Sequence, residues 1–298
     1  MKRSSRGKPP SPDAAKVARL QALPAGSAEQ VRAAAALLQA ARTLEATHIA
    51  LVVLTAAPSV ALRPLLLAKY AACDADGVKH DPGGLIRIAL LERLRPLVLP
   101  EDTALLERAA TTYEFLYGEA TGDLRAAALL VLNEADDRLV SFHCVRLLVD
   151  EYTSIMSGEP AVTAARILAA QGQLLPLYAY VTQASRTVAD VVAECLRGLP
   201  ALPASLLPPL VVRYAASEDE IVLLGLFDLL LARDDRDEYL DTLLAFLQTT
   251  SLHNIFRYLV SALIAGRDTS AVDALVALAD VERDPLKREI VREALELR

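Results

Sequence analysis

The residues best suited to chemistry gather in one stretch of the sequence, which holds Cys73, Asp74, Asp76, His80 and Asp81. A calcium loop needs converging oxygen ligands in an Asp-x-Asp-x-Asp-Gly pattern with a late Glu, and only a fragment of that pattern is present. Zinc prefers a full set of nitrogen and sulfur ligands, and here only the thiol and the imidazole qualify. We therefore predict no metal and interpret 73–84 as a polar irregular loop that contacts a partner.

Tyr and Arg are favoured anchors at protein interfaces. Two Arg–Tyr pairs, Arg213-Tyr214 and Arg257-Tyr258, are candidates for such contacts if they face outward near one end of the fold. Each tyrosine could equally fill a gap between layers of helices. The remaining candidate contacts come from the loop and are Asp76, Lys79, His80 and Asp81.

No catalytic pattern emerges elsewhere. The histidines are scattered, and His143, between Phe142 and Cys144, is interpreted as a half-buried packing residue. Adjacent carboxylates such as Asp136-Asp137 fall at helix junctions, where turn formation and capping explain them. The sequence contains no phosphate-cradling glycine loop and no Gly-x-Ser-x-Gly elbow. We predict no catalytic residue, no cofactor and no metal.

The composition predicts helices. Hydrophobic residues make up 53% of the chain but aromatics only 5%, and Trp is absent. The apolar excess is mostly Ala and Leu, which are strong helix formers. No run alternates apolar and polar residues between turns, so we predict no sheet. The most apolar stretch, 49–62, is too short to cross a membrane and contains a proline. With three widely spaced cysteines and no secretory signal, we predict a cytoplasmic protein.

Charge argues against nucleic acid as the main partner. The formal net charge is −7, and the dense basic cluster is confined to the first eight residues. A protein that neutralises phosphates is usually basic or carries a basic stripe. We predict that 1–11 is a disordered, solvated basic tail, which could touch nucleic acid or a membrane surface. The rest of the chain, 12–298, is predicted to be a single domain.

The C-terminal half repeats itself. Four similar segments recur roughly every 32–34 residues, a period typical of arrays of supersecondary units that cannot bury their apolar faces alone. Short turns with Gly, Asp, Ser or Pro separate the helices within and between them. The four segments are 174–196, 207–229, 243–263 and 276–295.

The second helix of several pairs begins with an acidic residue, then a basic or apolar position, then a run rich in Ala or Leu. Examples lie at 81–91, 123–129, 159–166 and 284–288. This pattern resembles the HEAT repeat, including HEAT-containing bacterial proteins of unassigned activity. The resemblance implies an all-α fold, a right-handed α-solenoid or superhelix of antiparallel helix pairs. Armadillo-like pairs are an alternative.

The resemblance also implies a function. We expect a non-catalytic scaffold or adaptor that binds a protein partner on the concave surface of the stack, and no membrane. The alternative is an enzyme or nucleic-acid-binding protein on the same scaffold, similar to HEAT-like alkylated-DNA glycosylases or bilin lyases. The acidic balance and the lack of Trp count against a glycosylase. Neither the partner nor the oligomeric state follows from the sequence.

Overall fold

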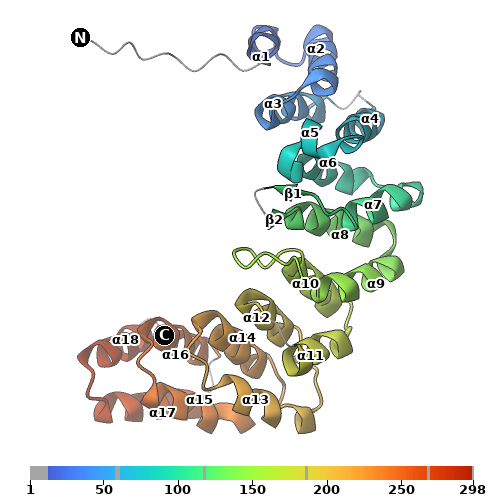
Figure 1. The fold of residues 1–298 in the computed structure, drawn as a ribbon. Coiled ribbons are helices and arrows are strands. Elements are labelled where there is room, and N and C mark those ends of the chain that lie inside the picture. Colours follow the sequence, from blue (N-terminus) through green and yellow to red (C-terminus); the bar gives the residue numbers. More distant parts are fainter. Residues whose placement is uncertain (1–12, 58–60, 117–118, 185–186, 267–268, 297–298) are drawn as a thin grey trace, which may run out of the picture. The chain divides into compact units, whose positions relative to one another are not determined.

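The computed structural model describes residues 13–57, 61–116, 119–184, 187–266 and 269–296. The predicted tail, 1–11, lies outside this part of the chain. As the composition predicts, the described chain is all-helical, with helices α1 to α18 (Figure 1). The backbone divides into two compact units: unit 1 is Met1–His143 with Glu151–Ser154, and unit 2 is Cys144–Asp150 with Ile155–Arg298. The single domain expected for 12–298 stays a prediction.

Unit 1 is built by packing each helix pair on the next. Besides the contacts within pairs, α2 packs on α4, α4 on α6, and α6 on α8. Every second helix therefore contacts the corresponding helix of the next pair, and these helices form a row. The core lies along this row, where the facing Leu and Ala side chains are buried. The elements are α1 (Ala14–Gln21), α2 (Ala28–Ala40), α3 (Leu44–Thr55), α4 (Leu62–Asp74), α5 (Gly77–His80), η1 (Pro82–Gly84), α6 (Leu85–Leu94), η2 (Arg95–Leu97), η3 (Pro100–Asp102), α7 (Thr103–Ala110), β1 (Phe115–Leu116), β2 (Glu119–Ala120) and α8 (Gly122–Ala135).

Helix α9 (Asp137–Leu148) contributes residues to both units. Unit 2 repeats the packing of unit 1: α10 packs on α12, α12 on α14, α14 on α16, and α16 on α18. Its elements are α10 (Ala161–Ala170), α11 (Leu174–Gln183), α12 (Ala189–Arg197), η4 (Ala204–Leu206), α13 (Pro208–Tyr214), α14 (Glu220–Leu231), η5 (Arg236–Tyr239), α15 (Leu240–Thr249), α16 (His253–Ala265), α17 (Thr269–Val281) and α18 (Pro285–Glu296).

Polar residues begin several helices, as the sequence pattern indicates. Ser27 accepts a hydrogen bond from the backbone N–H of Gln30 at the start of α2, and Asp219 accepts from Ile221 and Val222 at the start of α14. These side chains satisfy amides that have no partner inside the helix. Local capping therefore sets where helices begin.

One feature departs from the prediction of no sheet. β1 and β2 form a short antiparallel ladder that pairs Phe115 with Ala120 and Leu116 with Glu119. The segment before β1 is rich in Thr and aromatic residues, which suit extended backbone. The ladder adds no layer to the fold, and the all-helical class is unchanged. Among the described residues, no helix has the length and apolar character needed to cross a bilayer.

Close packing of α12 on α14 depends on Gly225, in the middle of α14. A Cβ atom at this position would lie 2.5 Å from the Cα of Ala193 and 2.8 Å from its carbonyl oxygen. Those distances are far inside van der Waals contact, and both atoms belong to a helix backbone that cannot move aside alone. The two helices can therefore approach this closely only with glycine at 225.

The substitution Gly225→Ala should destabilise the protein by about 1–3 kcal/mol, because the added methyl group overpacks the α12–α14 contact. Alanine normally stabilises a helix interior relative to glycine by roughly 0.5–1 kcal/mol, so the sign of the effect is diagnostic. Urea denaturation of the wild type and the variant measures it. A variant as stable as the wild type or more stable would contradict the close approach.

Candidate functional site

The segment 73–84 is mostly helical, so the prediction of an irregular loop is wrong. α4 continues through Cys73 to Asp74, and α5 and η1 follow directly. The Asp76 carboxylate accepts a hydrogen bond from the backbone N–H of Lys79 at 3.3 Å and so caps α5. The side chains of Asp76, Lys79 and His80 are exposed, and they remain available to a partner.

Asp81 is a structural residue, and its prediction as a partner contact is wrong. Its side chain is only 2% exposed. The carboxylate accepts hydrogen bonds from the backbone N–H groups of Ile86 at 2.8 Å and Arg87 at 2.9 Å. It therefore caps the start of α6, and a carboxylate placed there also complements the helix dipole.

Arg87 is completely buried and joins three carboxylates. Its guanidinium donates to Asp81 at 3.1 Å and to Asp74 at 3.4 Å, and both of its terminal nitrogens donate to Glu114. Burial alone would lower the pKa of Arg87, but the hydrogen bonds to Glu114 and Asp81 raise it above its ordinary value. This cluster holds α4, the start of α6 and the segment before β1 together.

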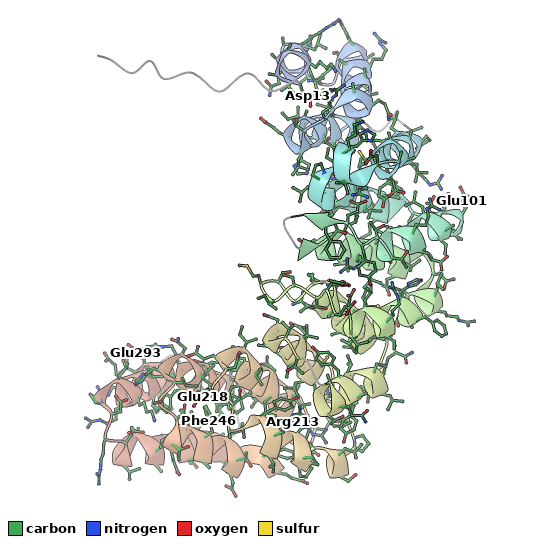
Figure 2. All side chains as sticks on the ribbon, in the orientation of Figure 1. Asp13, Glu101, Arg213, Glu218, Phe246 and Glu293 are labelled. Atoms are coloured by element: carbon green, nitrogen blue, oxygen red, sulfur yellow. The ribbon has the colours of Figure 1, made fainter. Side chains whose placement is uncertain are left out.

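The two Arg–Tyr pairs do not form a common surface. Tyr214 is buried and its hydroxyl donates to the carbonyl of Val181 at 2.6 Å, so its prediction as an outward anchor is wrong and the alternative, packing between layers, is right. Arg213 is exposed on α13 (Figure 2), and it donates to the Thr182 carbonyl at 2.8 Å.

The second pair lies on α16. Tyr258 is half-buried and donates its hydroxyl to Asp228 on α14. Burial and this hydrogen bond raise the pKa of Tyr258 to about 12. Arg257 is exposed and forms an ion pair with Glu293 of α18 at 3.0 Å. Both residues thus link neighbouring layers, and only Arg257 presents an exposed head group.

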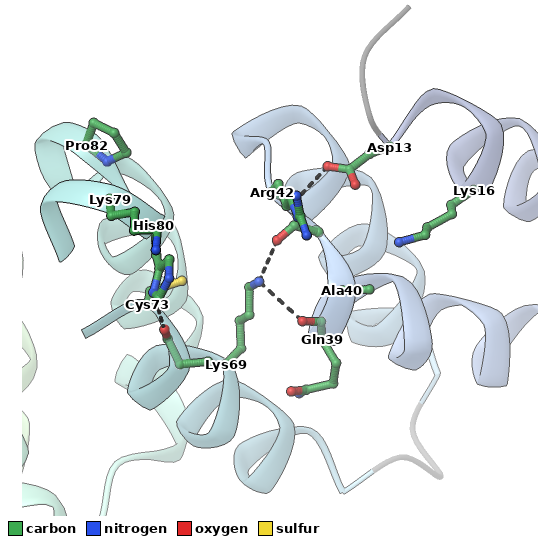
Figure 3. A pocket seen from close by; sticks show the side chains of 12 residues that line it. Asp13, Lys16, Gln39, Ala40, Arg42, Lys69, Cys73, Lys79, His80 and Pro82 are labelled. Carbon is green, nitrogen blue, oxygen red and sulfur yellow. Dashed lines mark hydrogen bonds between the residues drawn. The ribbon is translucent and has the colours of Figure 1, made fainter. Parts of the chain in front are cut away.

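A hollow of about 1090 Å³ in unit 1 brings Lys79 and His80 together with residues that sequence reasoning missed (Figure 3). It is lined by α1, α2, α4, α5 and η1. We call it the basic hollow, because its ionisable lining holds four cations, one histidine and one carboxylate besides a buried cysteine. These residues are Lys16, Arg42, Lys69, Lys79, His80 and Asp13.

Asp13, the carboxylate of this group, is engaged in structure. Its Oδ2 atom accepts hydrogen bonds from the backbone N–H groups of Arg42 at 2.8 Å and Thr43 at 3.0 Å, and from the Thr43 hydroxyl at 3.0 Å. Burial tends to raise its pKa, but these hydrogen bonds and nearby Lys16 bring it below the ordinary value. Asp13 thus stays ionised near neutral pH and ties α1 to the α2–α3 connection.

Lys69 is the buried cation of the hollow, with an exposure of 5%. Its ammonium donates to the carbonyls of Ala41 at 2.6 Å and Gln39 at 3.4 Å, which end α2 (Figure 3). Carbonyls at a helix C-terminus lack partners inside the helix, and a cation there is favourable. The sequence carried one signal of this role, a lysine inside the apolar run of α4.

His80 has a fixed tautomer in the neutral state. Its Nδ1 lies 3.1 Å from the carbonyl of Ala72. A carbonyl only accepts hydrogen bonds, so Nδ1 must carry the proton and Nε2 is left as an acceptor. The hollow therefore offers several cationic donors and one imidazole nitrogen, a set suited to binding an anion.

A second feature of unit 1 is a group of partly exposed aromatic rings, which we call the aromatic cluster: Tyr113, Phe115 and Tyr152. Tyr152 meets Tyr113 and Phe115 edge to face, at centroid distances of 5.7 and 5.2 Å. The buried guanidinium of Arg125 lies over Tyr113 at 4.2 Å. β1, which carries Phe115, packs against η1, and Pro82 of η1 lines the basic hollow.

Among the described residues, no group of three or more His, Cys, Asp and Glu side chains is arranged so that it could hold a metal ion. As predicted, His143 is half-buried, and its Nε2 lies 3.4 Å from Glu107. The three cysteines are buried and unbonded to one another.

Comparison with known proteins gives no relative: no family model, no curated protein and no solved structure matches this chain.

The substitution Arg87→Met should lower the free energy of unfolding by about 3–5 kcal/mol, because it leaves the buried Asp81 and the partly buried Asp74 and Glu114 without their cation. Arg95→Met is the matched control. Arg95 pairs with Glu134 at the surface, where such a pair contributes about 0–1 kcal/mol. Urea denaturation compares both variants with the wild type. Equal losses in the two would show that the Arg87 cluster does not hold this part of unit 1 together.

Native thiols should react slowly. Burial raises the pKa of Cys73 and Cys195, and raises that of Cys144 to about 12. At pH 8 a thiol of that pKa is deprotonated roughly a thousand times less often than an ordinary cysteine. Ellman's reagent should therefore titrate three thiols rapidly in denaturant and almost none in the native protein. A fast native reaction would mean that a cysteine is exposed.

Proposed function

We propose that this chain is a non-catalytic scaffold that binds a protein partner, built as an α-solenoid of HEAT-like helix pairs. The observation that carries the proposal is the aromatic cluster, a partly exposed group of rings that lie before β1, on β1 and in the turn after α9 and pack edge to face on one another. Tyr113 is 37% exposed, Phe115 50% and Tyr152 44%. Aromatic side chains with fixed orientation supply much of the binding energy at protein interfaces.

The packing within each unit supports the solenoid. Every second helix contacts the next, and the same arrangement occurs in both units. Contacts of this kind extend only to neighbouring layers, which is the property that lets repeat proteins grow by addition and present large surfaces. The linking hydrogen bonds and ion pairs join residues about one repeat apart, such as Arg197 with Asp228 and Arg257 with Glu293.

The chemistry of the described residues also favours binding over catalysis. The cysteines are buried with raised pKa values, the carboxylates Asp13 and Asp81 are engaged by backbone amides, and Arg87 is enclosed by its partners. A nucleophile or general base needs an accessible group with a matched pKa. The buried thiols fit a reducing compartment, and we place the protein in the cytoplasm.

Affinity capture from the native cell tests the scaffold proposal. The wild-type protein should retain a specific protein partner, and the double variant Phe115→Ser/Tyr152→Ser should bind it more weakly by about 2 kcal/mol, roughly 30-fold. The matched control is Val212→Ser, which removes a strongly exposed apolar side chain from α13. Isothermal titration with the purified partner gives the magnitude.

Two results would contradict the proposal. One is equal loss of the partner in the aromatic variant and the control, which would mean that the cluster is no anchor. The other is firm, salt-sensitive binding of duplex DNA in an electrophoretic shift at low salt, which would favour a nucleic-acid-binding protein.

A further inference from the structure

The basic hollow runs against the charge of the whole chain. The sequence has a formal net charge of −7, yet this concavity is lined by Lys16, Arg42, Lys69 and Lys79 against a single carboxylate. In the part of the chain that the structure describes, none of these four cations forms an ion pair. A concave surface lined by one sign of charge concentrates ligands of the opposite sign.

The carboxylate of the hollow accepts hydrogen bonds from the backbone, and Lys16 is the cation close enough to help lower its pKa. Asp13 directs one oxygen to the backbone amides of Arg42 and Thr43 and to the Thr43 hydroxyl. The ammonium of Lys69 is fixed by the two carbonyls that end α2. The side chains of Lys16, Arg42 and Lys79 are exposed, and they can reorient toward a ligand. The hollow thus combines one buried fixed charge with three adjustable ones.

The four cations come from different elements. Lys16 lies on α1, Arg42 follows α2, Lys69 lies on α4 and Lys79 on α5. A single small anion is best held by donors that converge on one point, whereas cations spread around a hollow of about 1090 Å³ suit several charges spaced along one chain. Arg42 can hold a carboxylate through two parallel hydrogen bonds, and the lysines act as point charges.

The backbone lining the hollow favours a peptide over a phosphate ligand. Phosphate sites typically use backbone N–H groups at helix N-termini. Here the C-terminal ends of α2 and α5 line the hollow, where the backbone presents carbonyls, and the start of α1 that also lines it carries the carboxylate of Asp13. The carbonyls of Gln39 and Ala41 already accept hydrogen bonds from Lys69, so the N–H donors of a peptide are left to the other carbonyls and to the Nε2 atom of His80.

We propose that the basic hollow binds an acidic segment, rich in Asp or Glu, of the protein partner. The inference rests on the proposed scaffold function and names the chemistry of what the scaffold recognises. The acidic segment lies among Arg42, Lys69 and Lys79. β1, which carries Phe115, packs against η1, and Pro82 of η1 lines the hollow. Because of this proximity, the aromatic cluster contacts a separate, apolar part of the same partner.

A fluorescein-labelled octapeptide of alternating Glu and Ser tests the proposal by fluorescence anisotropy at low ionic strength, with Gln–Ser and Lys–Ser octapeptides as references. The wild-type protein should bind the Glu peptide and neither reference. The double variant Arg42→Glu/Lys79→Glu should bind the Glu peptide at least about tenfold more weakly. The reason is that it replaces two cations of the hollow with carboxylates, which repel the carboxylates of the peptide.

The matched control is Arg288→Glu/Arg292→Glu on α18, two exposed arginines of unit 2 outside the hollow. It changes the net charge of the chain by the same amount and should leave the affinity for the Glu peptide within about twofold of the wild type. Thermal unfolding of both variants checks that each is folded. The side chains replaced in the two variants are all exposed, so both variants should fold.

The proposal is overturned if the wild type does not bind the Glu peptide, or if the hollow variant and the α18 variant lose equal affinity, since net charge alone would then explain the result. If about 10 mM phosphate abolishes binding and sodium chloride of the same ionic strength does not, the proposal is also overturned, in favour of a phosphate site. Capture of the partner through the aromatic cluster tests the scaffold separately, so failure here leaves that result standing.

Discussion

The fold of each unit depends on the burial of the apolar face of one helix pair against the next pair. A pair such as α11 and α12 has an apolar face that its own two helices cannot cover, and α12 closes it only by packing on α10 and α14. Burying apolar surface stabilises by about 25 cal/mol per Å², so each layer depends on its neighbours. Gly225 shows how tight this contact is, because even one methyl group at that position would strike the backbone of α12.

Polar interactions then fix how successive layers align. Arg166 pairs with Glu194, Arg197 with Asp228, and the Tyr258 hydroxyl with the same Asp228. Burial tends to raise the pKa of Glu194, but its two arginine partners lower it below the ordinary value, so it is ionised near neutral pH. Partly exposed ion pairs contribute little energy individually. Their recurrence at a repeat-like spacing indicates that they set the register of layers that apolar contacts alone would allow to slide.

The way in which the carboxylates of unit 1 are engaged also accounts for the charge of the basic hollow. Asp81, Asp74 and Glu114 are satisfied by Arg87, and Asp13 is satisfied by the amides that follow α2. With these carboxylates engaged in this way, none of Arg42, Lys69 and Lys79 forms an ion pair within the described part of unit 1. The engagement of these carboxylates thus leaves cations as the prevailing charge of the basic hollow.

The sequence by itself determined the all-helical class, the polar and acidic residues that begin helices, and the half-buried position of His143. These follow from local propensity, capping and apolar periodicity, which act over a few residues. It also singled out Lys79 and His80. Only the tertiary structure decided that Asp81 and Tyr214 are internal, and that Lys16, Arg42 and Lys69 share a hollow with Lys79. Residues on separate helices meet only through packing between layers, and a local pattern carries no information about which side chains that packing brings together.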